Sequence, residues 1–147
     1  ATVTAVGNTK NMELIKSLGA DKTYDYLKED FTKDTEKYHY VFDAVGKSSF
    51  GECKHLLLPR GVYISSELGP NAQNLYLPLI TWVLRGKRVV FPLPINCKRS
   101  ILFMAELLEL GKFKPVIDST YSLEQVSEAY EYVLTGQKTG NVILSMS

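Results

Sequence analysis

Short apolar, β-branched runs alternate along this chain with segments in which apolar residues recur at helical spacing. The extended runs lie at residues 2–6, 22–26, 38–46, 61–66, 87–91, 116–117 and 141–145. The helical segments lie at 12–18, 50–57, 74–84, 99–110 and 123–134. Such alternation is typical of a parallel sheet wound with helices, and it predicts an α/β fold that is Rossmann-like, doubly wound and mostly parallel.

Individual residues define several of these elements more closely. Residues 38–46 form a nearly continuous apolar run, which is expected for a strand buried on both faces. Gly19 follows the first helical segment, where a left-handed residue commonly ends a helix. Ser122 and Gln125 have the spacing of a capping box, so they predict where the last helix begins.

Composition narrows the class of protein. The 147 residues include 17 Lys+Arg against 16 Asp+Glu, and the net charge of +1 gives no electrostatic footprint for nucleic acid or an anionic membrane surface. No apolar stretch approaches the ~18 residues that a membrane-spanning helix needs. Two cysteines cannot build a disulfide framework, so we expect a reducing, cytoplasmic compartment. The length favours one domain.

In wound sheets of this kind, ligands bind beyond the carboxyl ends of the strands. The first run is followed by Gly7, Asn8, Thr9 and Lys10, which place amide, hydroxyl and ammonium groups in a row. Neutral donors with one cation can hold a phosphate, although an ordinary polar turn with Lys10 in solvent explains the same residues. The corresponding ends of three further runs are rich in glycine or proline, at 43–46, 65–69 and 91–94.

Other sources of chemistry are thin. The two cysteines and two histidines include no pair at a metal-ligand spacing, so no metal site is expected. Cys53 falls on the apolar face of its helix and is expected in the core. The sequence contains neither a Gly-x-Gly-x-x-Gly fingerprint nor a Gly-x-Ser-x-Gly elbow. The residues alone therefore predict an α/β ligand-binding domain and no more.

Six segments, taken in order, resemble the cofactor domain of the medium-chain dehydrogenases/reductases. The resemblance is strongest to the zinc-independent, quinone-oxidoreductase-like branch, which is often labelled zinc-binding dehydrogenase. The combination of Ser-Leu-Gly-Ala-Asp, Asp-Ala-Val-Gly and Thr-Gly-Asn-Val is fairly specific. The matching segments span essentially the whole chain, at 3–6, 8–11, 16–21, 41–46, 59–63 and 138–142.

The resemblance implies a binding site for NADP(H). Residues 7–10 would line the adenosine ribose pocket, where Lys10 would pair with a 2′-phosphate because no acidic residue stands among them. By resemblance, Tyr26 would lie near the same phosphate and Lys138 would approach it from the closing loop. The nucleotide would pass over Val45 and Gly46, and the nicotinamide half would contact residues 66–69 and Phe91. The full set of implied cofactor residues is Gly7, Asn8, Thr9, Lys10, Tyr26, Val45, Gly46, Ser66, Gly69, Phe91 and Lys138.

Departures from the family pattern are equally informative. The resemblance implies an N-terminal substrate domain and a first strand–helix unit with the glycine fingerprint, and this chain matches neither. We therefore expect residues 1–147 to be a partial cofactor domain, cut from a larger reductase, with no catalytic and no metal-binding residue of its own. The strand at 3–6 is expected either to close directly on the strand at 41–45 or to pair with another copy. By resemblance, the strand at 87–91 would pair with its counterpart in a homodimer.

Two functions from different classes remain open. The first is the cofactor part of an NADP(H)-dependent oxidoreductase that transfers hydride to a quinone, enone or carbonyl substrate, with the isolated chain expected to be inactive. The alternative is a non-catalytic module for nucleotide binding or oligomerisation. A flavodoxin-like receiver is disfavoured, since the strand ends carry no acidic cluster or phosphate loop.

Overall fold

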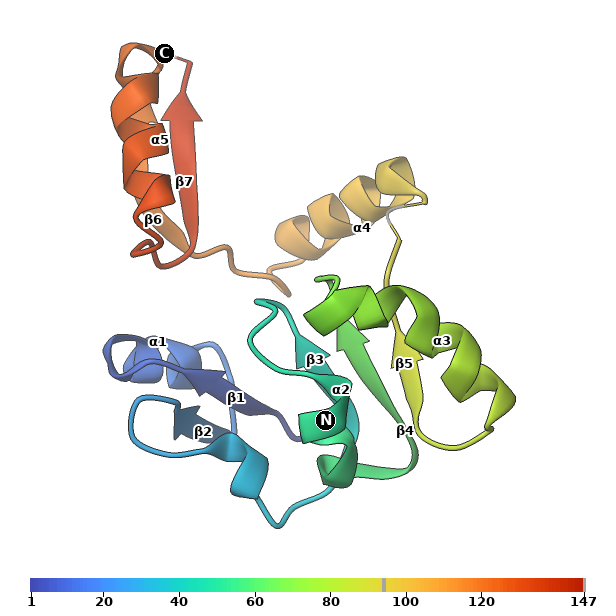
Figure 1. The fold of residues 1–147 in the computed structure, drawn as a ribbon. Coiled ribbons are helices and arrows are strands. Elements are labelled where there is room, and N and C mark those ends of the chain that lie inside the picture. The colour runs from blue at the N-terminus through green and yellow to red at the C-terminus, as the bar shows by residue number, and fades with distance from the viewer. Residues whose placement is uncertain (94, 147) are drawn as a thin grey trace. The chain divides into compact units, whose positions relative to one another are not determined.

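Parallel strands joined by helices make up the chain, shown in Figure 1 as a computed structural model that describes residues 1–93 and 95–146. Pro94, which the sequence groups with the end of the 87–91 strand, lies outside the described residues. The chain divides into two units. The β3–β5 unit holds Thr4–Thr9 and Lys22–Ile95, and the α4–β7 unit holds the segments at 1–3, 10–21 and from Asn96 onward.

The β3–β5 unit contains two parallel sheets. Strand β1 (Thr4–Gly7) pairs with β2 (Lys22–Asp25). Strands β3 (Tyr38–Asp43), β4 (Leu57–Ser65) and β5 (Arg88–Val90) form the second sheet in the order β3-β4-β5. All three pairings are parallel, so the carboxyl ends of β3, β4 and β5 share one edge of their sheet.

Two helices complete the β3–β5 unit. Helix α2 (Phe50–Cys53) begins at Ser49, whose hydroxyl accepts the Glu52 N–H, and it continues as a 3-10 turn over Lys54–Leu56. Helix α3 (Gln73–Val83) lies beside β5 (Figure 1). The core of this unit is formed by Phe50, Cys53, Leu57, Tyr63 and Val89, which confirms the prediction that Cys53 is buried.

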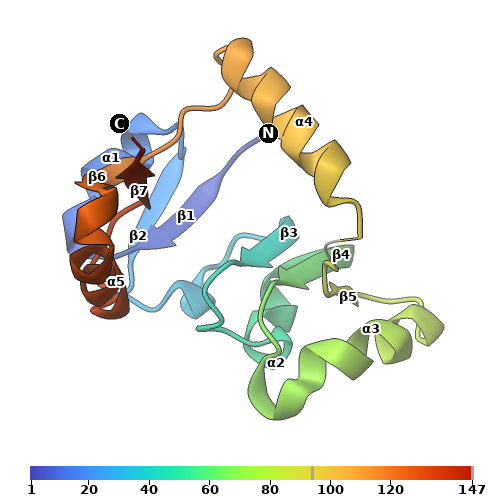
Figure 2. The same cartoon turned by 90° about the horizontal axis from the view of Figure 1, so that it is seen from above.

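The α4–β7 unit contains a parallel pair, β6 (Ile117–Ser122) and β7 (Asn141–Ser145), with α5 (Val126–Leu134) packed against both strands (Figure 2). The same unit contains α1 (Met12–Ser17) and α4 (Cys97–Glu109). Ser122 and Gln125 form the predicted capping box before α5. Gly19 adopts φ +101° just beyond α1, as its position predicted.

The α/β class with parallel strands is confirmed, but backbone hydrogen bonding divides the described strands into three sheets. The expected closure of the 3–6 strand on the 41–45 strand is wrong. In the described residues β1 forms a ladder only with β2, and β3 only with β4. A side-chain contact relates β1 to β3 instead, because the Tyr38 hydroxyl lies 3.3 Å from Thr4 Oγ1. Pairing of β1 with another copy stays a prediction.

Strand β4 is longer than its apolar pattern indicated, since it begins at Leu57 and not at Gly61. Its first part contains Pro59 and Arg60, and Arg60 takes the left-handed φ of +64°. The ladder with β3 shifts register between Tyr38 and Tyr40 at this irregular stretch. No helix in the described part of the chain is both long and apolar enough to cross a membrane.

Candidate functional site

The carboxyl end of β1 brings together four of the implied cofactor residues, Gly7, Asn8, Thr9 and Tyr26. Tyr26 donates its backbone N–H to the Gly7 carbonyl at 3.0 Å, and Thr9 donates its hydroxyl to the carboxylate of Asp25. Asn8 lies between Gly7 and Thr9 and is half-buried, while the Tyr26 side chain is exposed. The ends of β1 and β2 therefore form one polar edge in the β3–β5 unit.

Asp25 is the residue of this edge that the sequence reasoning missed. Its side chain is buried, accepts the Leu27 N–H at 3.1 Å and lies 3.3 Å from Lys28 Nζ. The hydrogen bond from Thr9 does most to hold the pKa of the Asp25 carboxyl below its usual value, against the opposing effect of burial. The signal was available, because an acidic residue that ends a parallel strand lies beside the end of its neighbour.

Lys10 and Lys138 belong to the α4–β7 unit. The Lys138 ammonium donates to the Gly140 carbonyl at 2.8 Å, and the neighbouring Thr139 hydroxyl donates to Asn11 Oδ1 at 3.1 Å. Thr139 also donates its backbone N–H to Asp118 at 2.6 Å. The closing loop at 138–140 is thus held against the segment that begins at Lys10.

Asp118 supplies a carboxylate close to Lys10. The Thr139 N–H lowers the pKa of Asp118 most, followed by the Tyr132 hydroxyl, and the positive charge of Lys10 contributes to the same lowering. A phosphate bound at Lys10 would therefore meet a cation that already interacts with an acidic group. This was not visible in residues 7–10 alone, since Asp118 lies more than a hundred residues away in sequence.

The loop after β3 is held by the carboxylate of Asp43. Asp43 accepts the backbone N–H groups of Val45 at 3.1 Å, Gly46 at 2.8 Å and Ser48 at 3.1 Å, and the Tyr63 hydroxyl lies 3.1 Å from it. Burial pushes the pKa of Asp43 upward, but the three backbone donors outweigh it, and the pKa lies below its usual value. The buried carboxylate therefore holds the backbone of Val45 and Gly46 in place through these hydrogen bonds.

Tyr63 is fully buried and connects β4 to this loop. Its hydroxyl lies 3.1 Å from the Ser48 carbonyl oxygen and 3.3 Å from Ser48 Oγ, in addition to the contact with Asp43. Burial is the main reason why the pKa of Tyr63 is raised to about 12. Neither Asp43 nor Tyr63 was singled out as a site residue from the sequence, although Asp43 begins the Asp-Ala-Val-Gly segment that carries the resemblance.

The loops after β3 and β4 meet at Gly46. This glycine adopts φ +73°, and a Cβ atom added to it would lie 2.6 Å from Glu67 Cγ. The two loops are also joined by the Ser66 N–H, which donates to the Asp43 carbonyl at 3.4 Å. The structure thus brings Val45 and Gly46 next to residues 66–69, as expected for two parts of one surface.

Gly69 adopts φ +69° before α3, where a Cβ atom would lie 2.8 Å from Asn74 Nδ2. Asn74 is fully buried and donates this amide to the Glu67 carbonyl at 2.7 Å. Its Oδ1, together with Gln73 Nε2, has no hydrogen-bond partner among the described residues. Phe91 follows directly after β5 and is half-buried. The three strand ends of this sheet therefore carry Val45, Gly46, Ser66, Gly69 and Phe91.

Metal-binding side chains do not gather in groups of three or more within the part of the chain that the structure describes. His55 contacts the Thr32 carbonyl oxygen through Nε2 at 2.6 Å, and the His39 residue is exposed. The arrangement at the strand ends can bind and orient a ligand through backbone and amide groups.

Comparison with known proteins identifies the family. The sequence profile of the zinc-binding dehydrogenases matches residues 18–144, so the chain belongs to the zinc-binding dehydrogenase family. Among curated relatives, the 2-methylene-furan-3-one reductase of Solanum lycopersicum is 33% identical over 144 residues, covering 97% of this chain and 33% of the relative. The chloroplastic NADPH-dependent alkenal/one oxidoreductase of Arabidopsis thaliana is 28% identical, with 97% of this chain and 33% of the relative covered.

Solved structures show the same fold. The quinone oxidoreductase from Coxiella burnetii superposes with a TM-score of 0.79 at 20% identity, covering 99% of this chain and 45% of that structure. The fold of this chain is therefore also found in that solved structure. The chain spans between a third and a half of the length of the proteins named here.

Proposed function

We propose that this chain is the cofactor-binding part of an NADP(H)-dependent oxidoreductase that reduces a quinone, enone or carbonyl compound. Family membership and the names of the reductases that it resembles support this proposal. The bound nicotinamide would supply the hydride, and the residues of this chain would bind the cofactor, orient it and exclude water. The chain on its own would not catalyse turnover, because none of its residues matches a catalytic position of the family.

The main structural support for the proposal is the contact between the loop after β3 and the loop after β4. Two glycines, Gly46 and Gly69, stand there with positive φ, and a side chain at Gly46 would collide with Glu67. Backbone without side chains lets an extended ligand approach closely. The Asp43 carboxylate holds the same loop from the buried side, so the surface offered to a nucleotide is formed before the ligand arrives.

Preference for NADP(H) over NAD(H) rests on the charges near the first strand end. Residues 7–10 contain Lys10 and no acidic residue. The nearby Asp25 already accepts the Thr9 hydroxyl and pairs with Lys28, so its charge is partly balanced. By the family resemblance, Lys10 would bind the 2′-phosphate, with Lys138 of the same unit near it. One curated relative is named for the use of NADPH.

A paired titration tests the cofactor preference. NADPH and NADH are added to the purified chain and to the Lys10→Ala variant, and affinity is followed by calorimetry. We expect the substitution to weaken NADPH about tenfold, the loss for one charge-assisted hydrogen bond, and to leave NADH nearly unchanged. Lys112→Ala, an exposed lysine of the same unit, is the matched control. Equal losses for the two cofactors would remove the assignment of Lys10.

A homodimer through the 87–91 strand is a further part of the proposal. In the structure, the Val89 N–H donates to the Thr81 hydroxyl of α3 at 3.0 Å. Pairing with a second copy must therefore either break this hydrogen bond or use other backbone groups of the strand. Sedimentation at high micromolar concentration tests the dimer, and a single monomeric species would exclude it. The expectation of a cytoplasmic compartment stays a prediction, since one relative named above is chloroplastic.

A further inference from the structure

Two buried polar atoms at the start of α3, Asn74 Oδ1 and Gln73 Nε2, make no hydrogen bond among the described residues. Both side chains lie next to Gly69, since a Cβ atom added there would lie 3.2 Å from Asn74 Cγ and 3.2 Å from Gln73 Cγ. Asn74 is fully buried. A buried polar atom without a partner lowers the stability of the fold, so the amide of Asn74 requires an explanation in its other contacts.

The remaining polar groups of Asn74 bind the loop after β4. Its Nδ2 donates to the Glu67 carbonyl at 2.7 Å, and its backbone N–H donates to the Leu68 carbonyl at 3.0 Å. Of the two polar atoms of the amide, only Nδ2 can donate to a carbonyl oxygen. The hydrogen bond to Glu67 therefore sets the orientation of the Asn74 side chain and leaves Oδ1 unpaired.

Ser65, the last residue of β4, binds the backbone of the same residue. Its hydroxyl accepts the Glu67 N–H at 3.2 Å and donates to the Glu67 carbonyl at 3.3 Å. Ser65 is fully buried, whereas Glu67 is exposed. The backbone of an exposed loop residue is thus held by two buried side chains, one from β4 and one from α3.

The side chain of Glu67 connects this loop to the loop after β3. Its Cγ and Cβ would lie 2.6 and 2.9 Å from a Cβ atom added to Gly46, so Glu67 packs closely against this glycine. The Gly46 N–H is in turn bound by Asp43 at 2.8 Å. A displacement of Glu67 would therefore disturb both of the loops that support the proposed function.

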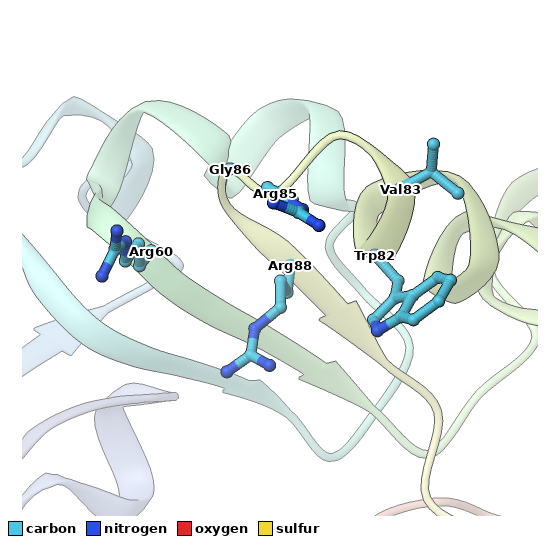
Figure 3. A pocket seen from close by; sticks show the side chains of 6 residues that line it. All are labelled: Arg60, Trp82, Val83, Arg85, Gly86 and Arg88. Atoms are coloured by element: carbon cyan, nitrogen blue, oxygen red, sulfur yellow. The ribbon is translucent and has the colours of Figure 1, made fainter.

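The other end of α3 lies away from these loops. Trp82 and Val83 border a hollow of about 570 Å³ that is also lined by Arg60 and Arg88 (Figure 3). Arg60 lies in the first half of β4, and Arg88 is the first residue of β5. The first turn of α3, in contrast, lies at the carboxyl end of β4, and ligands of wound sheets bind at the carboxyl ends of the strands.

We propose that Asn74 is a positioning residue for the cofactor, which holds Glu67 so that residues 66–69 and Gly46 keep the arrangement that binds the nicotinamide half. This inference rests on the proposed function, under which residues 66–69 would contact that half. Asn74 does not touch the cofactor, because its side chain is fully buried. It orders the loop before binding, and a loop that is already ordered loses less conformational freedom when the ligand binds.

The affinities of the whole chain for two probes isolate this role. NADP⁺ contains the nicotinamide half and adenosine 2′,5′-bisphosphate lacks it, and calorimetry gives both dissociation constants. We expect Asn74→Ala to weaken NADP⁺ about tenfold, as for one lost hydrogen bond. The affinity for the bisphosphate is expected to change by less than about twofold. A general loss of stability would affect the two probes alike, so the ratio of the affinities reports the positioning role.

Gln73→Ala is the matched control. The Gln73 side chain also lies next to Gly69, but its Nε2 binds no described residue. Truncation at this position removes an amide of the same helical turn without removing a hydrogen bond to the Glu67 carbonyl. We expect Gln73→Ala to leave both affinities within about twofold of those of the unmodified chain.

Asn74→Asp tests the donor itself. An ionised carboxylate at this position repels the Glu67 carbonyl, whereas burial favours the protonated form, whose O–H donates to that carbonyl. The affinity of this variant for NADP⁺, relative to the bisphosphate, is expected to be low at mildly alkaline pH and to recover at mildly acidic pH. Division by the ratio for the unmodified chain at the same pH cancels the titration of Asp43, of Glu67 and of the 2′-phosphate.

Hydrogen exchange without any cofactor tests the positioning of the loop separately. The backbone N–H groups of residues 66–69 are expected to exchange about tenfold faster in Asn74→Ala than in the unmodified chain. Gln73→Ala is expected to leave their exchange rates unchanged. Circular dichroism checks that each variant is folded.

The outcomes distinguish this inference from the proposed function. A chain that binds neither probe would contradict the proposed function, and this inference with it. If the unmodified chain binds NADP⁺ but Asn74→Ala keeps the same ratio of affinities, the proposed function stands and Asn74 has no positioning role. Unchanged exchange at residues 66–69 in Asn74→Ala, an equal loss in Gln73→Ala, or no recovery of Asn74→Asp at acidic pH would each overturn the inference as well.

Discussion

Removing the hydroxyl group of Tyr63 tests how the loop after β3 is held. In Tyr63→Phe the ring remains in the core, where it packs against Phe50 with 6.1 Å between ring centroids. The hydroxyl contacts with the Asp43 carboxylate and the Ser48 carbonyl, both at 3.1 Å, are lost. Because this residue is fully buried, water does not replace the missing donor.

The expected loss can be worked from these contacts. A hydrogen bond to a charged group contributes about 1.5–3 kcal/mol to stability. Asp43 keeps its three backbone donors, so a value in the lower half of that range is expected, about 2 kcal/mol. This corresponds to a decrease of about thirtyfold in the folding equilibrium constant.

Urea unfolding followed by far-UV circular dichroism measures this change. We expect the midpoint to fall while the dependence on urea stays the same, as for a loss of native-state stability. Tyr40→Phe is the matched control, because Tyr40 is 67% exposed and its hydroxyl is expected to contribute less than about 0.5 kcal/mol. If the two variants lose the same stability within error, Tyr63 does not hold the loop as described.

Three further predictions concern the same unit. Gly46→Ala is expected to lower the free energy of unfolding in urea by about 1–2 kcal/mol, because the residue has φ +73° and its Cβ would lie 2.6 Å from Glu67 Cγ. The control is Gly51→Ala, whose added Cβ meets only Ser49 Oγ at 3.8 Å. Equal stability of the two variants would contradict the reasoning. The Tyr63 pKa of about 12 in the folded chain lies above its unfolded value near 10, so the stability that its hydroxyl contributes is complete below about pH 10 and is lost as the pH rises from 10 to 12. Over that range the difference in stability between the unmodified chain and Tyr63→Phe should shrink by at most about 2.7 kcal/mol. A constant difference would refute this prediction. The Tyr38 hydroxyl does most to hold the pKa of Asp34 low, and Lys22 also contributes. The ionised Asp34 carboxylate therefore stabilises the fold above about pH 4, and this stabilisation is lost on acidification. Asp34→Asn should make stability depend less on pH on the acid side, and an unchanged pH dependence would show that Asp34 does not stabilise the fold in this way.

Local residue patterns predicted much of the fold because the interactions behind them are local. Ser122 and Gln125 cap the helix through contacts three residues apart, and the capping box was confirmed. The closing strand lies at Asn141–Ser145, where its apolar run placed it. Gly19 ends α1 with positive φ because a residue without a side chain meets no steric penalty there.

Longer-range features could not be predicted in the same way. Strand β4 extends back to Leu57, which pairs with Tyr38, and Pro59 and Arg60 lie in the irregular stretch between the paired residues Leu57 and Val62. The absence of a ladder between β1 and β3 in the described residues depends on tertiary placement, which no apolar pattern specifies. The hydrogen bond from the Val89 N–H to the Thr81 hydroxyl likewise has no signal in the sequence, although it occupies this backbone donor of β5.

The candidate site divides along the same line. Glycines at the strand ends marked the loops around Gly46 and Gly69, because positive φ restricts the residue type. The sequence did not indicate Asp43 or Tyr63 as site residues. Asp43 accepts backbone N–H groups of its own loop, and the Tyr63 hydroxyl contacts the Asp43 carboxylate from a different strand. Asp118 acts on Lys10 through a fold contact that has no local signature.

Binding of the reduced cofactor to the purified chain tests the central claim most directly. NADPH and NADH are titrated in parallel, and NADPH fluorescence and calorimetry report the two dissociation constants. The account predicts binding of NADPH below the millimolar range and tighter than that of NADH. If neither cofactor binds below that range, the strand ends of this chain do not form a nucleotide site, and the proposed function is contradicted.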